Sequence, residues 1–232
     1  MTVIFAIALA GCGGGTDEDS SATTSPVGST PAYPKPSDAP YAELLAADNT
    51  GFSDSDNYTR RRTLRYSVTL PVDGAGLEYS TNFGGTWINW SRNIPLQRDT
   101  VTVSFSTDGD KNVQFRATNG PAGESKGPVF SASTITIDTI APTTPVFEVP
   151  SGGTLTTTDK RFRWQWAKVY GGANETYFDV YLDGVAVKLG TKDNYYAPTT
   201  DLAVGNHVLR VQAYDLSGNP APATVSSTVT IQ

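Results

Sequence analysis

The chain has 232 residues, of which 17% are charged, with 22 Gly, 15 Pro and a formal net charge of −6. This is the composition of a globular protein that is rich in turns and mildly acidic. Nucleic acid binding needs a basic surface, and the one basic cluster, Arg60-Arg61-Arg62, is interpreted as a solvent-exposed guard beside a strand, so no nucleic acid partner is expected.

Residues 2–10 form an uncharged apolar run directly after Met1. The run is shorter than the roughly 20 residues that span a bilayer, and it has the length of the apolar core of a secretion signal. No Lys or Arg precedes it, although signal peptides usually begin with basic residues, which leaves open a start further upstream. We predict a signal peptide at residues 1–11.

The only cysteine of the chain, Cys12, ends the sequence Leu9-Ala10-Gly11-Cys12. This sequence resembles a bacterial lipobox, which implies that the Cys12 thiol receives a diacylglycerol and that Cys12 becomes the first mature residue. Two or more acyl chains such as palmitate on one residue give stable membrane anchoring. Gly13 stands where an aspartate would resemble an inner-membrane retention signal, so the expected location is the outer membrane or the cell surface.

The segment after Cys12 is almost free of large apolar side chains as far as Pro40. Such a segment cannot bury enough surface to offset the entropy lost on ordering, and we predict a disordered linker. Residues 12–47 are therefore assigned to the lipidated cysteine and a flexible linker. A brief helical spacing occurs only at residues 41–47, within YAELLAA.

Beyond the linker, short runs alternate apolar and polar residues, which is the period of half-buried strands. In residues 100–106 the side chains of Val101, Val103 and Phe105 share one face, and in residues 112–118 the apolar positions alternate in the same way. The body of the protein is therefore predicted to be all-β.

A repeat indicates two domains. Residues 113–125, VQFRATNGPAGES, align with residues 209–222, LRVQAYDLSGNPAP, and each copy is followed by a turn and a last strand. The copies lie about 95 residues apart, which is the size of an immunoglobulin-like sandwich of about 100 residues. We predict one sandwich at residues 48–140 and a second, immunoglobulin-like or fibronectin-like, at residues 141–232.

Three segments carry a resemblance to a known family: DNTGFSDSDNYT at 48–59, IDTIAPTTP at 137–145 and VQAYDLSGNPAP at 211–222. They are similar to the signatures of bacterial Ig-like repeats in large surface adhesins. The resemblance implies tandem β-sandwiches on a lipoprotein, and it does not identify a ligand. The second domain departs from the pattern, because residues 150–155, PSGGTL, stand where the first signature would lie.

The sequence lacks an evident set of catalytic residues, and we expect no enzyme activity. The only histidine, His207, lies in phase with the apolar Leu209 and is interpreted as structural. Asp108, Asp110 and Asp215 lie in Gly-containing turns, where turn chemistry accounts for them.

Calcium is the one metal ion that the sequence favours, because loops at domain ends can supply oxygen ligands. Asp48, Asp54 and Asp56 at the start of the first domain, and Asp138 at the join, occupy positions where the adhesin repeats that they resemble can hold an ion. Solvated turn and capping aspartates are the alternative. No other cofactor is expected.

Tryptophans give a first candidate for ligand binding. Strand alternation places Trp87 and Trp90 on opposite faces, with Trp90 on the face of Ile88 and in the core, so Trp87 is expected to be exposed. The aromatic residues of 162–166, FRWQW, share one face and are predicted to be core.

Tyrosines give a second candidate. Tyr177, Asp179 and Tyr181 share the face opposite Phe178 and Val180, so they are predicted to form an exposed row suited to binding.

Together these features predict a lipid-anchored envelope protein with modules for adhesion, protein binding or a structural role in a surface assembly. The alternative is a carbohydrate-binding protein for glycan or peptidoglycan, using Trp87 or the tyrosine row. The expected partners are the membrane, through Cys12, and a protein or a surface glycan.

Overall fold

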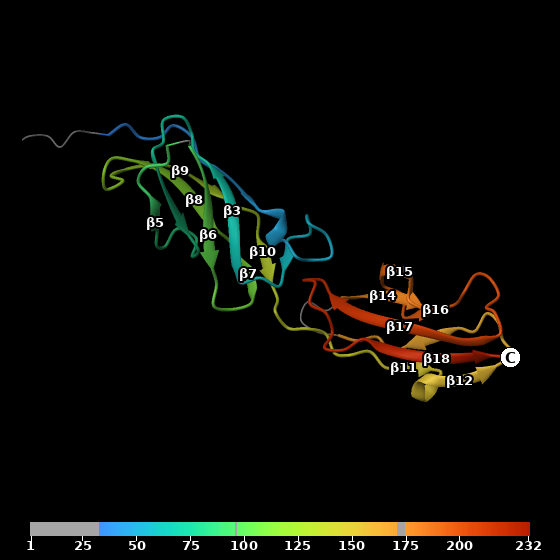
Figure 1. The fold of residues 1–232 in the computed structure, drawn as a ribbon. Helices are drawn as coiled ribbons and strands as arrows, with labels where there is room; N and C mark the ends of the chain where they lie inside the picture. The colour runs from blue at the N-terminus through green and yellow to red at the C-terminus, as the bar shows by residue number, and fades with distance from the viewer. Residues whose placement is uncertain (1–32, 96, 171–174) are drawn as a thin grey trace, which may run out of the picture. The chain divides into compact units, whose positions relative to one another are not determined.

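The computed structural model describes residues 33–95, 97–170 and 175–232 (Figure 1). The predicted signal peptide, Cys12 and the first part of the predicted linker lie outside the described residues. Within the described residues the regular elements are strands and two short 3-10 helices. The predicted all-β fold is therefore confirmed.

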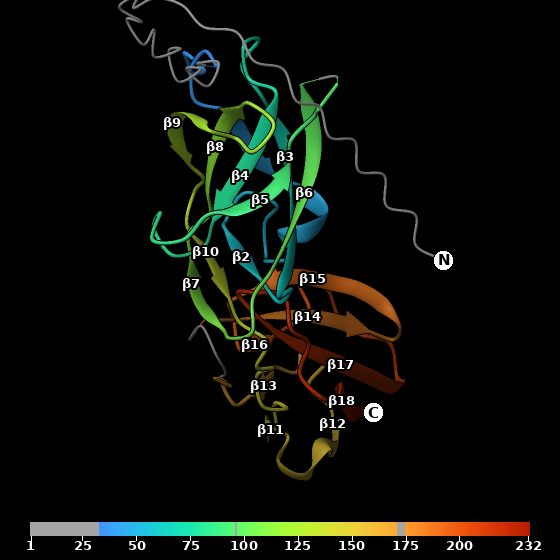
Figure 2. The same ribbon diagram turned by 90° about the vertical axis from the view of Figure 1, so that its left-hand side faces the viewer.

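Residues 41–137 form the first sandwich. Its strands are β1 (Tyr41–Leu44), β2 (Tyr58–Thr59), β3 (Thr63–Thr69), β4 (Gly76–Ser80), β5 (Ile88–Ser91), β6 (Arg98–Ser104), β7 (Gly109–Lys111), β8 (Gln114–Asn119), β9 (Ser125–Ser131) and β10 (Ile135–Ile137). A 3-10 helix, η1 (Ala46–Asp48), follows β1. The strand orders are β1-β3-β6, β5-β4-β8-β9 and β2-β10-β7. In Figure 2 the strands β3 and β6 lie across from β8 and β9, as in two packed sheets.

Alternation of apolar residues builds the core between these sheets. In β3 the side chains of Leu64, Tyr66 and Val68 are buried, whereas their neighbours in the strand are more exposed. Val101 and Val103 of β6 are also buried, as the alternation predicts. Burial of each such side chain stabilises the fold by about 1.5–3 kcal/mol.

The start of the first sandwich lies earlier in the chain than predicted. β1 pairs antiparallel with β3, and the side-chain amide of Asn119 donates to the Pro34 carbonyl at 2.9 Å. Pro36 is buried. Described residues before 48 are therefore part of the sandwich, and the linker prediction is wrong for that stretch. The helical spacing of 41–47 was also misleading, because tertiary pairing with β3 overrides a weak local propensity.

Residues 147–231 form the second sandwich. Its strands are β11 (Phe147–Val149), β12 (Thr154–Thr157), β13 (Trp164–Trp166), β14 (Thr176–Leu182), β15 (Val185–Thr191), β16 (Tyr195–Tyr196), β17 (Gly205–Asp215) and β18 (Val225–Ile231), with a 3-10 helix η2 (Ser151–Gly153). The strand orders are β11-β13-β16 and β12-β18-β17-β14-β15.

The two sandwiches share a topological detail. In each of them an early strand pairs in parallel with the last strand, β2 with β10 and β12 with β18, while the other pairings are antiparallel. The repeated apolar positions also agree, because Phe115 and Ala117 of the first copy and Val211 and Ala213 of the second are all fully buried. The repeat thus marks equivalent strands, β8 and β17.

Candidate functional site

Trp87, the first predicted aromatic binding residue, lies beside an arginine. Trp87 is half-buried, and the guanidinium of Arg116 lies over its ring at 3.9 Å from the centroid. Arg116 in turn is held by Glu78 at 2.8 Å. Trp87 is therefore partly covered by a cation held in place, and its ring is not a free platform.

The prediction that Trp90 faces the core is confirmed, because Trp90 packs against the first hydrophobic core, but the prediction that Ile88 shares this face is wrong. Ile88 is 45% exposed, whereas Trp90 is half-buried and donates its indole N–H to Asp99 at 2.7 Å. β5 is an edge strand with a register shift in its pairing with β4, so strict alternation along 86–91 does not predict which side chains face the core. Trp164 and Trp166, by contrast, are fully buried, as predicted.

The tyrosine row of β14 is only partly exposed. Tyr177 is 8% exposed, because the Phe52 ring from the first sandwich stacks on it with a centroid distance of 4.0 Å and an interplanar angle of 9°. Asp179 accepts the amide N–H of Gly190 at 2.9 Å. Tyr181 is half-buried, and the guanidinium carbon of Arg210 lies 5.5 Å from the centroid of its ring. The prediction of an open row is therefore wrong at Tyr177.

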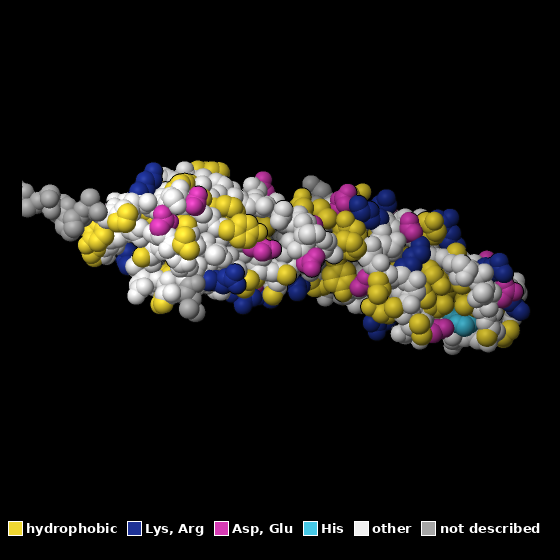
Figure 3. Space-filling model, turned by 90° about the horizontal axis from the view of Figure 1, so that it is seen from above, with side chains coloured by type: hydrophobic (Ala, Val, Ile, Leu, Met, Phe, Trp, Pro, Cys, Tyr) yellow, Lys and Arg dark blue, Asp and Glu magenta, His cyan; other side chains and the backbone are white. Residues whose placement is uncertain are grey.

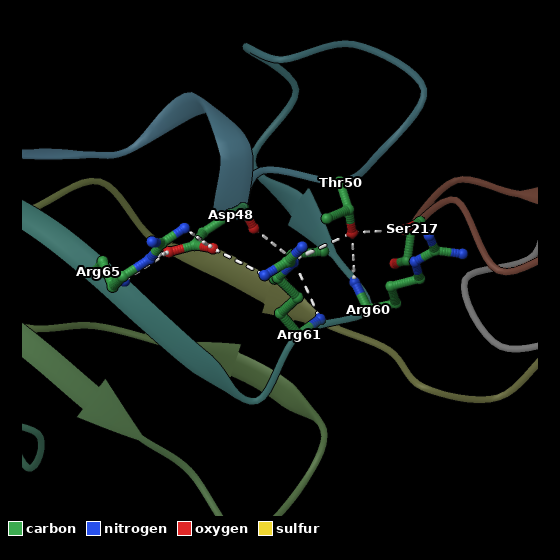
Figure 4. Close-up of polar contacts among 7 residues, drawn as sticks. Asp48, Thr50, Arg60, Arg61, Arg65 and Ser217 are labelled. Atoms are coloured by element: carbon green, nitrogen blue, oxygen red, sulfur yellow. Dashed lines mark hydrogen bonds and ion pairs between the residues drawn. The ribbon is translucent and has the colours of Figure 1, made fainter.

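The predicted calcium ligands are dispersed among structural roles. Asp48 is fully buried and ion-paired with Arg65 at 2.8 Å and with Arg61 at 3.3 Å, as Figure 4 shows. Burial by itself would raise the pKa of Asp48, but the hydrogen bonds and charge of Arg65, together with the charge of Arg61, lower it.

The other three aspartates lie in turns and at the join. Asp56 accepts the backbone N–H groups of Ser53 and Tyr58, Asp54 is exposed, and Asp138 accepts the N–H of Ile140 at 2.9 Å. Among the described residues there is no group of three or more acidic, His or Cys side chains that could hold a metal ion. Calcium stays a prediction, and equal melting temperatures with calcium and with a chelator would contradict it.

The arginine cluster is not merely a solvated guard, although its three residues are exposed. Arg61 binds Asp48, Arg62 binds Asp108 at 2.9 Å, and Arg60 donates to the Gly218 carbonyl at 2.9 Å. Sequence reasoning missed these roles because each partner lies on a different loop.

The segments that resemble adhesin signatures meet where the two sandwiches join. Tyr33–Gln232 clusters as one compact unit. Thr50 donates to the Ser217 carbonyl at 3.1 Å, the Phe52 N–H donates to the Leu216 carbonyl at 3.1 Å, and Asn219 donates to the Asp138 carbonyl at 2.8 Å. Figure 4 shows Thr50 between Arg60 and Ser217. We name these contacts, with the Phe52–Tyr177 stack, the junction.

Two glycines make room for the junction. A Cβ on Gly190 would lie 2.4 Å from the Phe52 ring, and a Cβ on Gly218 would lie 2.1 Å from the Thr50 carbonyl oxygen. Both glycines have positive φ, at +59° and +80°, which other residues rarely adopt. The close approach of the two sandwiches therefore depends on glycine at these positions.

A buried carboxylate, that of Asp215, stabilises the turn through which the second sandwich contacts the first. Asp215 is 1% exposed and accepts both the backbone N–H and the side-chain amide of Asn219, each at 2.8 Å. Burial raises the pKa of Asp215, and the charge of Asp138 adds to this, while the Asn219 hydrogen bonds oppose it. Asp215 is thus a turn residue, in agreement with its sequence interpretation.

The His207 ring binds Asp183 at 2.7 Å and the Ala203 carbonyl at 2.9 Å. The Asp183 carboxylate, and after it the Ala203 carbonyl, accept hydrogen bonds from the charged ring, and these bonds raise the pKa of His207. His207 of β17 and Asp183 of the β14–β15 turn therefore form a pair that links the turn to the strand.

A groove of about 440 Å³ opens in the first sandwich between β1 and the segment that joins β9 to β10. Its lining includes Tyr41, Asn49, Tyr66 and Phe130, none of which the sequence singled out. The signal that could have pointed to it is the aromatic Tyr41, directly after the polar, Pro-rich segment that ends at Pro40. Figure 3 shows hydrophobic, acidic and basic side chains interspersed on the face that it displays.

No helix of the described residues is both long and apolar enough to cross a membrane. Cys12, the predicted lipidation site, lies outside the described residues.

No family model and no curated protein matches the chain. Among solved structures, the chain is similar to the fibronectin(III)-like modules of Clostridium thermocellum CbhA, with 14% identity, a TM-score of 0.52, and coverage of 83% of this chain and 94% of that one.

Two further structures are similar at lower scores. The FN1-FN3 domains of chicken CNTN1 have 12% identity and a TM-score of 0.32, and the match covers 85% of this chain and 66% of that one. The extracellular domain of protocadherin GammaB4 has 13% identity and a TM-score of 0.28, and the match covers 83% of this chain and 33% of that one. The likeness to the CbhA modules is one of fold, and it agrees with tandem immunoglobulin-like or fibronectin-like sandwiches.

Proposed function

We propose that this chain is a non-enzymatic protein of the bacterial cell envelope. In this proposal a lipid on Cys12 anchors it, a linker separates it from the membrane, and two sandwiches present surfaces for adhesion, for protein binding or for a surface assembly. The lipobox resemblance supports the anchor. The tandem fold supports a role in binding, although a fold by itself does not define a ligand.

The observation that carries the proposal is the junction. Thr50, Phe52 and Arg60 of the first sandwich all contact the turn or sheet of the second. Domains of one chain move relative to one another by default, unless the interface between them is large and hydrophobic. The junction adds hydrogen bonds and one aromatic stack to the chain connection between the sandwiches, which favours a preferred arrangement of the two binding modules.

The structural roles of the acidic and histidine side chains support the proposal of a non-enzymatic protein. His207, Asp48 and Asp215 each make two or more structural hydrogen bonds or ion pairs. Any hydrolytic turnover by the purified protein would contradict this part of the proposal.

Fractionation of cells that express the full chain tests the anchor. Wild type and Ser20→Ala are expected in the membrane fraction, with an intact mass that starts at Cys12 and includes acyl chains. Cys12→Ser is expected to leave that fraction, because the thioether to the lipid cannot form. An unmodified wild-type chain that retains Met1 would overturn the proposal of a lipid anchor.

Cross-linking on intact cells tests the role in binding. Wild type is expected to capture a defined envelope partner, and capture is expected to fall with Phe52→Ala, which weakens the junction without touching the core. Capture that is equal in wild type and in the variant would show that the coupling of the sandwiches is not required.

A further inference from the structure

The groove of the first sandwich lies where two sheet edges face each other. β1 is the edge strand of one sheet, and β9 is the edge strand of the other. The loop after η1 adds Asn49, Asp54, Ser55 and Asn57 to the lining. The volume of about 440 Å³ lies within the range of small-molecule sites, roughly 300–1,000 Å³.

Two aromatic rings stand together in the wall. Tyr41 and Phe130 meet edge to face with a centroid distance of 5.6 Å, and Tyr41 is 59% exposed. An exposed aromatic ring with a hydroxyl offers a large apolar contact together with a polar tip. A ligand with both C–H faces and hydroxyl groups matches this wall.

Two buried oxygen atoms in the lining lack hydrogen-bond partners among the described residues. They are the hydroxyl of Tyr66, a residue that is 1% exposed, and the side-chain carbonyl of Asn49, which is 8% exposed. Unsatisfied buried polar groups are rare in folded proteins, and each of them suggests a missing ligand, ion or water. Both residues line the same groove.

The chemistry of these oxygens is complementary. The Asn49 carbonyl can only accept a hydrogen bond, whereas the Tyr66 hydroxyl can also donate one. Burial raises the pKa of Tyr66, which keeps its hydroxyl protonated and able to donate. A ligand hydroxyl both donates and accepts, so the hydroxyl groups of a sugar match the hydrogen-bonding needs of both residues.

Charge narrows the class of ligand. The lining includes two exposed acidic residues, Glu43 and Asp54. No Lys or Arg is among the described lining residues. The protein as a whole carries a net charge of −6. An anionic glycan would meet repulsion in this groove, whereas a neutral one would not.

We propose that the groove lined by Tyr41, Asn49, Tyr66 and Phe130 binds a neutral saccharide of one or two rings. The Tyr41 ring packs against the sugar, and Tyr66 and Asn49 bind its hydroxyl groups. This inference rests on the proposed function as an envelope binding protein, and it places the site away from Trp87, Tyr177 and Tyr181.

Titration calorimetry of the full chain tests the assignment with four neutral probes: cellobiose, chitobiose, mannobiose and lactose. At least one is expected to bind in a saturable manner, and its sialylated or sulfated counterpart at least tenfold more weakly. Tyr66→Phe removes a single hydroxyl that has no hydrogen-bond partner among the described residues, so this variant is expected to keep its melting temperature and to lose at least tenfold in affinity. Tyr41→Ala is expected to lose affinity as well.

The matched control is Tyr196→Phe, which makes the same change at a half-buried residue of β16 in the second sandwich and is expected to bind like wild type. Affinity unchanged in both Tyr66→Phe and Tyr41→Ala but lost in Trp87→Ala would overturn the site and leave a binding function in place. Failure of all four probes, with an envelope protein still captured by cross-linking, would overturn the saccharide assignment alone. Failure of both measurements would overturn the proposed function too.

Discussion

Asp48 shows how a single carboxylate can organise the start of a domain. Its Oδ2 atom accepts the backbone N–H of Arg65 at 2.9 Å and the Nε–H at 2.8 Å, and its Oδ1 atom accepts from Nη2 of the same residue at 3.0 Å. The Asp48 carbonyl accepts the Thr59 hydroxyl at 2.6 Å. These bonds tie η1 to β2 and β3, so the residue that was a candidate metal ligand fixes the local fold.

Asp48→Asn is expected to lower the free energy of unfolding by about 1–3 kcal/mol, because Arg65 loses a charged partner at a buried position. The folded-state pKa of Asp48 is lowered, so its stabilising effect is present above the unfolded pKa and is lost as the pH falls through the folded value. Thermal unfolding should therefore show a gap between wild type and variant at pH 7 that closes below about pH 4.

The control is Asp54→Asn, a change at an exposed residue, which should alter stability by less than about 0.5 kcal/mol. A gap between Asp48→Asn and wild type that stays constant down to pH 2 would show that the charge of Asp48 is not what stabilises the fold.

His207 gives a prediction of opposite sign. Its pKa is raised by Asp183 and Ala203, so its contribution to stability is fully present below the unfolded value of about 6.5 and is lost as the pH rises through the folded value. Proton NMR of the imidazole ring measures this directly, because the chain has one histidine. The midpoint is expected above 6.5 in wild type and nearer to 6.5 in Asp183→Asn. A wild-type midpoint at or below 6.5 would contradict the pairing.

At the scale of elements, β13 is a short strand that contributes two large side chains to the second core. Trp166 is fully buried between Phe147 and Phe178, with ring centroids at 6.2 Å and 5.5 Å. Trp164 is equally buried and packs on Phe162 at 5.2 Å. The three-stranded sheet of β11, β13 and β16 therefore depends on β13 for its packing against the larger sheet.

Trp166→Ala is expected to destabilise the second sandwich by about 3–5 kcal/mol, since the removed side chain leaves a cavity that the sheets cannot fill completely. Circular dichroism during thermal unfolding measures this. Val204→Ala, at a residue that is 70% exposed, is the control and should have little effect. A change below 1 kcal/mol in Trp166→Ala would mean that the core can collapse onto the gap.

Alternation and repetition predicted the elements well where the strands are regular and central. They placed Val101 and Val103, Phe115 and Ala117, and the FRWQW aromatics on core faces. They did less well at edges and loops: Tyr41 joins a sheet through pairing with Thr69, and Ile88 lies in an edge strand with a shifted register. The local period of apolar residues does not encode β-bulges or the pairing of strands that are distant in sequence. An interpretation of one strand at a time therefore cannot predict them.

The candidate sites were less predictable than the fold for a related reason. A strand face that has no core role can still be covered by another part of the chain, as Phe52 covers Tyr177. Turn residues such as Asp48 and Asp138 could be recognised by type, but their partners come from loops far away in sequence. The groove combines residues of β1, β3, β9 and a loop, and none of these segments is unusual alone.

At the scale of the whole molecule, the Phe52–Tyr177 stack should couple the two sandwiches energetically. A double-mutant cycle with Phe52→Ala and Tyr177→Ala, followed by calorimetry, is expected to give a coupling free energy of about 0.5–1.5 kcal/mol, the usual range for aromatic pairs. The pair Phe83→Ala and Tyr177→Ala is the control, because Phe83 is 78% exposed and should act independently. Zero coupling in the first cycle would mean that the stack does not join the sandwiches.

The junction also sets an order of events during synthesis. The first sandwich can complete its sheets once Ile137 in β10 has emerged, but the turn that receives Thr50 and Phe52 includes Ser217 and Asn219. At the usual elongation rates of about 5–20 residues per second, the second sandwich takes several seconds to emerge after the first one is complete. During that interval the face of the Phe52 ring that later stacks on Tyr177 is exposed to solvent, and the ring stays 53% exposed in the folded protein, so the second sandwich covers only part of it.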